Sequence, residues 1–222
     1  MKREIITTAD GSRSIRIPEM DETYHSSHGA VQEAKHVFIE NGLNALTSLS
    51  SIRIFEMGFG TGLNALLTLE AAEQQKKYIH YIGLEAFPVA LEMALQMDYE
   101  QFVSIENQHF FTSIHTSEWN SDQSITPFFT LKKIEEKMES FIPQKSSIDL
   151  IYFDAFGPRA QSDMWELSVL EKMEELLATG GVFVTYCAKG QLKRDLKSLD
   201  LRVESLPGPP GKREMTRAWK DL

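Results

Sequence analysis

The sequence predicts an α/β fold in which a mostly parallel sheet is covered by helices on both faces. Strand-like apolar segments alternate with helix-like segments, a glycine-rich turn joins one strand to the helix after it, and two β-prone runs close the chain. Alternation of this kind is typical of parallel sheets, because parallel strands need long crossover connections that helices supply. The predicted strands are 52–57, 78–84, 148–153 and 182–186, and the predicted helices begin at Leu63 and Pro88 or span 162–178.

An N-terminal extension precedes this alternating part. Asp10-Gly11 is a strong turn dipeptide between two β-prone runs, 4–8 and 14–17, and it predicts a β-hairpin. The next segment, 26–46, carries apolar side chains at helical spacing and a stop signal at Asn41-Gly42. We expect a helix there that packs beside the main sheet.

Length and composition favour one domain without disulfides. A chain of 222 residues fits a single domain of 1–222, with 1–48 as the hairpin and helix extension and 49–222 as the core. Cys187 is the only cysteine, so neither a disulfide within the chain nor a thiolate metal cluster is expected. No segment approaches the roughly 20 apolar residues of a membrane helix. We therefore expect a cytoplasmic protein that is neither secreted nor membrane-spanning.

Charge is spread unevenly along the chain. The formal net charge is −9, but residues 181–222 hold nine Lys and Arg against five Asp and Glu, a local charge of +4 that leaves −13 for residues 1–180. The total argues against a general polyanion binder, whereas a basic edge can still contact a nucleic acid through a few phosphates. The alternative is a solvated charged tail.

The sharpest local signal is the turn Gly58-Phe59-Gly60-Thr61-Gly62, between an apolar strand and a helix. Glycines let the backbone turn tightly and let a ligand approach main-chain N–H groups. Dinucleotide enzymes favour G-x-G-x-x-G, which would need a glycine at Leu63. Thr61 and Asn64 are candidate lining residues or, alternatively, capping residues of the helix.

Two carboxylates near this turn favour a cationic ligand over a phosphate. Glu56 stands two residues before Gly58, where it disfavours a pyrophosphate and favours the amino-bearing end of S-adenosylmethionine. Glu85 ends the next strand, where an acidic side chain can accept both hydroxyls of a ribose. The combination predicts a Rossmann-like, S-adenosylmethionine-dependent methyltransferase.

Asp154 is the candidate catalytic residue. It follows the strand 148–153, and ligands of open α/β folds bind at the carboxyl ends of strands. Its carboxylate can accept a hydrogen bond from an incoming amine, and Phe156 can offer a flat face to a base. Alternatively, Asp154 caps the turn into the next helix and Phe156 fills a gap.

The remaining segments give weaker evidence on fold and function. Residues 201–206 and 213–219 predict a closing antiparallel hairpin, a feature of class I methyltransferases. The region 98–145 follows no clean period and its elements stay open. His25 and His28 lack a third ligand at metal spacing, so we expect no metal and treat both as polar lining or surface.

Taken together, the motifs resemble the tRNA 5-methylaminomethyl-2-thiouridine methyltransferase family, which comprises the methyltransferase domain of the bifunctional enzyme MnmC and the stand-alone enzyme MnmD. The resemblance covers almost the whole chain. It rests on Asp10-Gly11-Ser12, Glu22-Thr23-Tyr24-His25-Ser26, Gly29-Ala30, Glu33, Glu56 to Asn64, Asp154-Ala155-Phe156-Gly157-Pro158, Met164-Trp165 and Gly211-Lys212-Arg213-Glu214-Met215.

The resemblance implies methylation of the exocyclic amine of 5-aminomethyluridine at the tRNA wobble position, with Asp154 at the catalytic centre. It implies that Tyr24 and Ser26 belong to a segment that closes over cofactor and substrate. It also places Lys212 and Arg213 on the substrate side, within the basic edge. From the residues alone, Tyr24 is equally a packed aromatic and the basic pair a surface turn.

Two features depart from the family pattern. The flavin oxidase that follows this domain in the bifunctional form is missing, so we expect only the methylation step, with separate enzymes supplying the aminomethyl precursor. In relatives, an acidic residue that lies near the adenine of the cofactor follows the next strand. This sequence has Lys133 in the corresponding stretch.

Two other functions compete with this interpretation. An aminopropyltransferase of the spermidine synthase type would also orient an amine with carboxylates, although Tyr24-His25-Ser26 and Gly211 to Met215 fit it poorly. A non-catalytic RNA-binding module would keep the fold without the chemistry, which the intact glycines and carboxylates disfavour. The oligomeric state is not predictable from these features.

Overall fold

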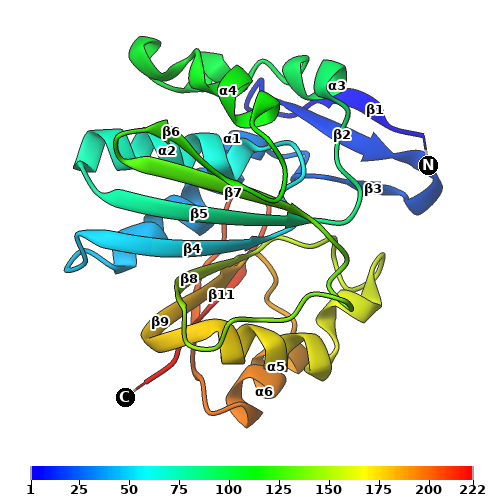
Figure 1. The fold of residues 1–222 in the computed structure, drawn as a ribbon. Coiled ribbons are helices and arrows are strands. Elements are labelled where there is room, and N and C mark those ends of the chain that lie inside the picture. Colours follow the sequence, from blue (N-terminus) through cyan, green and yellow to red (C-terminus); the bar gives the residue numbers. More distant parts are fainter. Residues whose placement is uncertain (1, 222) are drawn as a thin grey trace.

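The structure is a computed structural model that describes residues 2–221, and its centre is a twisted eight-stranded sheet (Figure 1). The strand order is β10-β11-β9-β8-β4-β5-β7-β6. The four pairs from β9 to β7 are parallel, while β6, β11 and β10 add antiparallel pairs at the two edges. The strands are β4 (Ser51–Met57), β5 (Tyr78–Glu85), β6 (Asp122–Thr126), β7 (Phe129–Glu135), β8 (Ile148–Phe153), β9 (Leu177–Thr185), β10 (Arg202–Pro207) and β11 (Glu214–Trp219). The predicted mostly parallel sheet and closing hairpin are confirmed.

Helices cover both faces of this sheet. α1 (Ala30–Ala34), α2 (Leu63–Gln75) and α4 (Phe110–Thr116) share one core with Ile52 and Ile54 of β4. α5 (Leu167–Leu176) and α6 (Gly190–Ser198) share the other core with Phe55 and Met57. The split follows from the strand period of two, which sends neighbouring side chains of β4 to opposite faces. A short helix, α3 (Leu91–Leu95), packs beside α4.

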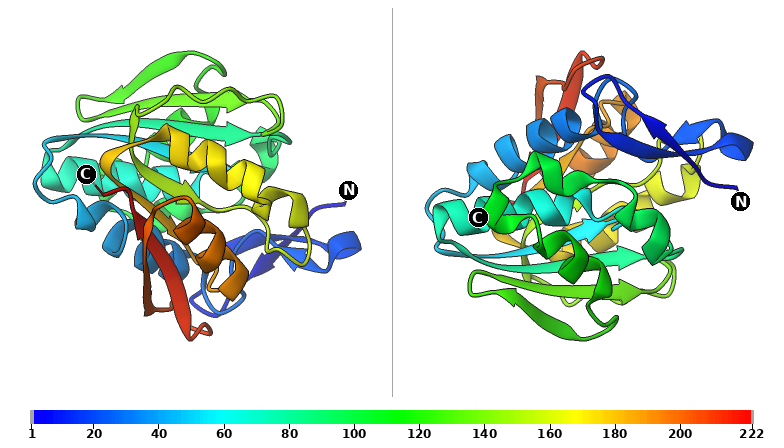
Figure 2. Two further views of the ribbon diagram at one scale, coloured as in Figure 1. Left: turned by 90° about the horizontal axis from the view of Figure 1, so that it is seen from below. Right: turned by 90° about the horizontal axis from the view of Figure 1, so that it is seen from above.

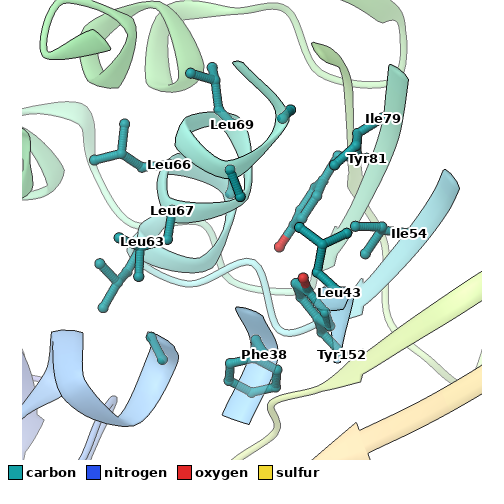
Figure 3. Close-up of a cluster of buried hydrophobic side chains, with 14 of the residues drawn as sticks. Phe38, Leu43, Ile54, Leu63, Leu66, Leu67, Leu69, Ile79, Tyr81 and Tyr152 are labelled. Carbon is teal, nitrogen blue, oxygen red and sulfur yellow. The ribbon is translucent and has the colours of Figure 1, made fainter. Parts of the chain in front are cut away.

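The core under α2 contains polar groups as well as apolar ones. Figure 3 shows the hydroxyl groups of Tyr81 and Tyr152 turned toward each other between α2 and the sheet. Both side chains are fully buried, and the Thr68 hydroxyl donates to the Tyr152 oxygen at 3.4 Å. Glu56 points to the same face of β4 as Ile52 and Ile54, so this polar cluster lies directly behind the glycine turn.

The N-terminal extension is a three-stranded antiparallel sheet followed by helical turns. The predicted hairpin is confirmed as β1 (Glu4–Thr7) and β2 (Arg13–Ile17), and β3 (Glu22–Thr23) pairs with β2 after a 3₁₀ turn at Pro18–Met20. The predicted helix is α1, continued by a π-helical segment at Lys35–Glu40 and a 3₁₀ turn at Leu43–Ala45. Figure 2 shows this extension (blue) beside the C-terminal hairpin (red).

Three predicted element boundaries are wrong. The helix predicted at 162–178 is broken, because Glu166 is extended (ψ 153°) between a 3₁₀ turn at Ser162–Trp165 and α5. Strand β9 begins at Leu177 rather than at residue 182, since Leu177 already pairs with Ile148 of β8. The helix predicted from Pro88 begins only at Leu91.

The region 98–145 resolves into short elements at one edge of the sheet. Two 3₁₀ turns, Tyr99–Phe102 and Ile105–Asn107, lead into α4, and the β6–β7 hairpin follows. Within residues 2–221, no helix has the length and apolar character needed to cross a membrane.

Candidate functional site

A cavity of about 330 Å³ lies at the carboxyl ends of β4, β5 and β8. The N-terminal extension contributes part of its wall through Arg3, Ile17, Tyr24 and His25. This position is where open α/β sheets bind ligands. Nine residues predicted for the site line the cavity: Tyr24, Gly58, Phe59, Gly60, Thr61, Asn64, Glu85, Asp154 and Phe156.

The glycine turn owes its shape to two positions that exclude side chains. Gly58 has φ +88°, and a Cβ there would lie 2.8 Å from the main-chain oxygen of Asp154. Gly62 has φ +72°, and a Cβ there would lie 2.9 Å from Nε2 of His115. Both positions combine a left-handed backbone with close packing, so only glycine fits them. Gly62 thus shapes the turn from behind and does not line the cavity.

Glu85 joins the end of β5 to the glycine turn. One of its carboxylate oxygens accepts a hydrogen bond from the Gly60 amide (2.9 Å), and the other accepts from the Phe87 amide (2.9 Å). An ionised carboxylate has about four acceptor positions, so two accepted bonds leave others for ligand hydroxyls. The side chain is half-buried and lines the cavity.

Asp154 lies at the end of β8, with its amide donating to the Met57 oxygen at 3.0 Å. Its Oδ2 accepts a hydrogen bond from the side-chain amide of Asn64 at 2.8 Å. Burial, together with the negative charge of Glu33, raises the pKa of Asp154 to about 7. A carboxyl group with such a pKa can accept a proton near neutral pH, which is the property of a general base.

The loop after Asp154 is fixed by two aromatic side chains. The Tyr186 hydroxyl donates to the Ala155 oxygen at 2.8 Å, and the Trp165 indole donates to the Phe156 oxygen at 2.7 Å. The ring of Phe156 meets the ring of Tyr24 edge to face, with centroids 5.1 Å apart. Tyr24 and Phe156 therefore pack against each other in the cavity wall.

Glu56 lies behind the cavity wall rather than in it. Its Oε1 accepts from the same Asn64 amide group that binds Asp154, at 2.8 Å, and burial raises its pKa well above the usual range. Within the described chain, Oε2 of Glu56 and Oδ1 of Asn64 are buried without a hydrogen-bond partner. Asn64 thus links Glu56 to Asp154, and its own unpaired oxygen is available to a donor.

The charges around the cavity suit a cationic ligand. Five carboxylates line it against two cations, Arg3 and Lys137. A negative surplus disfavours a pyrophosphate and favours a ligand that carries a sulfonium and an ammonium group. The glycine turn, the unpaired oxygen of Asn64 and the spare acceptor positions of Glu85 therefore fit S-adenosylmethionine.

Three predicted substrate residues lie outside this cavity. The Ser26 amide donates to Oε2 of Glu33 at 2.9 Å, and the Lys212 ammonium forms an ion pair with Oε1 of the same carboxylate. Lys212 also lies over the Tyr186 ring, 3.8 Å from its centroid. Arg213 is exposed in the turn beside it.

The position of Lys133 differs from the expectation that it lies near the adenine. Lys133 shares a face of β7 with Phe129 and Leu131, so it points toward α4, and its Nζ donates to the His115 oxygen at 2.8 Å. Glu136, directly after β7, lines the cavity instead. An acidic side chain directly after β7 therefore lines the cavity, whereas Lys133 does not.

Sequence reasoning assigned no site role to Glu33 or Tyr186. Glu33 is a buried charge on the otherwise apolar face of α1, three residues after Ala30, and that interruption is a usable signal. Tyr186 directly follows β9, so the strand-end rule that selected Asp154 would also have selected Tyr186. His25 lines the cavity, while His28 is exposed.

Comparison with known proteins decides the family. The family model described as S-adenosyl-L-methionine-dependent methyltransferase matches residues 107–221, slightly more than half of the chain. The chain belongs to this family. As a member of the S-adenosyl-L-methionine-dependent methyltransferases it uses the cofactor that the cavity fits.

Curated relatives of this methyltransferase include two proteins described as tRNA 5-methylaminomethyl-2-thiouridine biosynthesis bifunctional protein MnmC. The relative from Idiomarina loihiensis is 30% identical over 213 residues, covering 88% of this chain and 35% of that protein. The relative from Chromobacterium violaceum is 28% identical over 212 residues, covering 89% and 32%. The chain thus spans about a third of the length of these relatives.

A solved structure supports the methyltransferase fold. The crystal structure of MNMC2 from Aquifex aeolicus superposes with a TM-score of 0.78 at 24% identity, covering 100% of this chain and 72% of that one. The structure of DesVI from Streptomyces venezuelae gives a TM-score of 0.51 at 12% identity, covering 85% and 91%.

Proposed function

We propose that this methyltransferase methylates the exocyclic amine of 5-aminomethyluridine, or of its 2-thio form, at the wobble position of tRNA. The observation that carries the proposal is the half-buried carboxyl group of Asp154, which lines the cavity and whose pKa is raised to about 7. The relatives' names, which concern 5-methylaminomethyl-2-thiouridine in tRNA, supply the substrate. We expect the reaction to take place in the cytoplasm, with separate enzymes supplying the aminomethyl group.

An alkyl amine is protonated at neutral pH and cannot act as a nucleophile until it loses a proton. When bound, S-adenosylmethionine supplies a methyl group on a positively charged sulfur, and the sulfur keeps the electron pair of the broken bond. Asp154 accepts the amine's proton and holds the nitrogen in line. Asn64 donates to Oδ2 of Asp154, which fixes the carboxylate and leaves Oδ1 for the amine.

Residues around Asp154 complete the proposed roles. Phe156, whose ring meets the Tyr24 ring edge to face, would offer a flat face on which the uracil ring stacks. The glycine turn and Glu85 would bind the cofactor, with Thr61 as hydrogen-bonding lining. Glu56 would act from behind through Asn64, at the cationic end of the cofactor.

The N-terminal extension supports the exclusion of water that methyl transfer requires. The Arg3 guanidinium donates to the main-chain oxygens of Phe87 (2.6 Å) and Pro88 (3.0 Å), just after β5. It also lies over the Tyr24 ring, 5.8 Å from the centroid. These contacts hold the extension against the cavity mouth.

The experiment is transfer of a labelled methyl group from S-adenosylmethionine to two tRNAs, one with 5-aminomethyluridine and one unmodified. We expect wild type to label only the aminomethylated tRNA and Asp154→Ala to label neither. Labelling of unmodified tRNA, or of neither tRNA by wild type that binds the cofactor, would exclude this substrate. Transfer of an aminopropyl group in a parallel reaction with decarboxylated S-adenosylmethionine would instead establish the spermidine synthase type of reaction.

A further inference from the structure

A second pocket lies on the other side of the loop that carries Asp154. It is an open hollow of about 540 Å³ next to the C-terminal hairpin. Its lining includes Pro158 from the loop, Tyr186 and Lys189 after β9, and Lys212 and Arg213 from the turn between β10 and β11. Three of these five side chains are cationic.

Two of the three cations are free to bind a ligand. The Lys212 ammonium forms an ion pair with Glu33. Glu214, the acidic residue of the lining, forms an ion pair with Lys193 at 2.7 Å. Among residues 2–221, the side chains of Lys189 and Arg213 are exposed and form no hydrogen bond or ion pair. The free charge of this pocket is therefore positive, in a chain whose total is −9.

The pocket borders the loop that carries Asp154. The Tyr186 ring lines the pocket, and its hydroxyl donates to the oxygen of Ala155, the residue after Asp154. Pro158 lines the pocket from the other end of the same loop. A ligand whose reactive end reaches Asp154 would carry its flanking groups past Tyr186, toward Lys189 and Arg213.

We propose that this pocket binds a backbone phosphate of the RNA, adjacent to the nucleotide that is methylated. The inference rests on the proposed function, because it needs a substrate with phosphates on either side of the reacting base. Lys189 and Arg213 are the phosphate contacts, and Arg213 can bind two phosphate oxygens at once. The positive end of α6, which begins at Gly190, adds to the same potential.

This assignment divides the basic edge into two parts with different tasks. Lys212 is a positioning residue that faces Glu33 and Tyr186, not the RNA. Lys189 and Arg213 give the phosphate contacts. Of these two, only Arg213 was expected from the sequence to lie on the substrate side. Lys197, an exposed lysine in the last turn of α6, has no place in the pocket and serves as a matched control.

The test measures the affinity of tRNA bearing 5-aminomethyluridine by fluorescence anisotropy over a range of salt concentrations. The proteins are wild type, Lys189→Ala, Arg213→Ala, the double variant and Lys197→Ala. We expect the double variant to bind about tenfold more weakly at 0.1 M salt, with a salt slope lower by about one charge for each residue removed. Affinity for S-adenosylmethionine should equal that of wild type, and Lys197→Ala should bind tRNA like wild type.

If the double variant binds tRNA with the affinity and salt slope of wild type, the phosphate pocket is wrong. It is also wrong if Lys197→Ala loses as much tRNA affinity as the double variant, because the binding would then depend on the overall positive charge of this edge. Methyl transfer by wild type is measured in parallel on the same tRNA. Its absence would reject the proposed function, whereas methylation by wild type with unchanged binding in the double variant would reject only the pocket.

Discussion

The carboxylate of Glu33 in α1 forms an ion pair with the ammonium of Lys212 in the turn between β10 and β11. The pair joins the two ends of the chain, and Glu33 also accepts a hydrogen bond from the Ser26 amide. Both charges act on Asp154, since Glu33 raises the pKa of its carboxyl group and Lys212 lowers it. This contact therefore connects the stability of the N-terminal extension with the chemistry of Asp154.

The first prediction concerns this electrostatic coupling. Asp154 acts as a base only when ionised, so kcat/KM should rise with pH through about 7. Glu33→Gln removes the negative charge that raises this pKa, and the acid limb of the profile should move to lower pH. Glu40→Gln is the control. Glu40 is exposed and follows Glu33 in the same helical region, so its substitution should leave the acid limb at the wild-type pH. A limb that stays at the wild-type pH in Glu33→Gln would contradict the coupling.

The second prediction concerns the ion pair itself. Lys212→Met leaves the Glu33 carboxylate buried without its partner, and unpaired buried charges are destabilising. Because Lys212 is partly exposed, we expect a loss of about 2 kcal/mol in the free energy of unfolding, below the full cost of a deeply buried pair. Urea denaturation measures it. Adding Glu33→Gln to Lys212→Met should restore part of the lost free energy of unfolding. If the losses of the two single variants simply add in the double variant, the two residues are not coupled.

The third prediction concerns the glycine turn. Gly58→Ala combines a positive φ with a Cβ placed 2.8 Å from the Asp154 oxygen, so the loop must shift. Gly180→Ala has a similar φ of +80° but nothing within 4 Å, and it isolates the backbone cost of about 1 kcal/mol. Calorimetry should show lost S-adenosylmethionine binding in the first variant only. Equal affinities in the two variants would mean that the close approach at Gly58 is unimportant.

The fourth prediction separates binding from catalysis. Asp154→Asn keeps the size of the side chain and an oxygen for the Asn64 amide, but it removes the base. We expect kcat/KM to fall at least about 100-fold while cofactor affinity changes little. Activity near that of wild type would assign Asp154 to capping the turn.

The main parallel strands and the glycine turn were predictable because they depend on local patterns. Alternating apolar segments fix which segments are strands, and the strand-end rule placed Glu85 and Asp154 at one edge. The face of β7 was harder to predict, since its polar residues alternate without a clear apolar side, and Lys133 turned out to be buried. Glu136 was missed because the end of β7 was not predicted.

Contacts between distant segments could not be derived from spacing. Glu33 and Lys212 are 179 residues apart, and nothing local to either residue indicates the pair. The end of α5 at Leu176 likewise depends on the pairing of Leu177 with Ile148 of β8. Such features need the assembled sheet, because tertiary packing overrides local preference.

The most direct measurement is mass spectrometry of the nucleosides from aminomethylated tRNA incubated with the full chain and S-adenosylmethionine. We expect 5-aminomethyluridine to be converted to 5-methylaminomethyluridine, with no other nucleoside methylated. A methyl group on a ring atom or a ribose, or none on any nucleoside while the cofactor is bound, would contradict it.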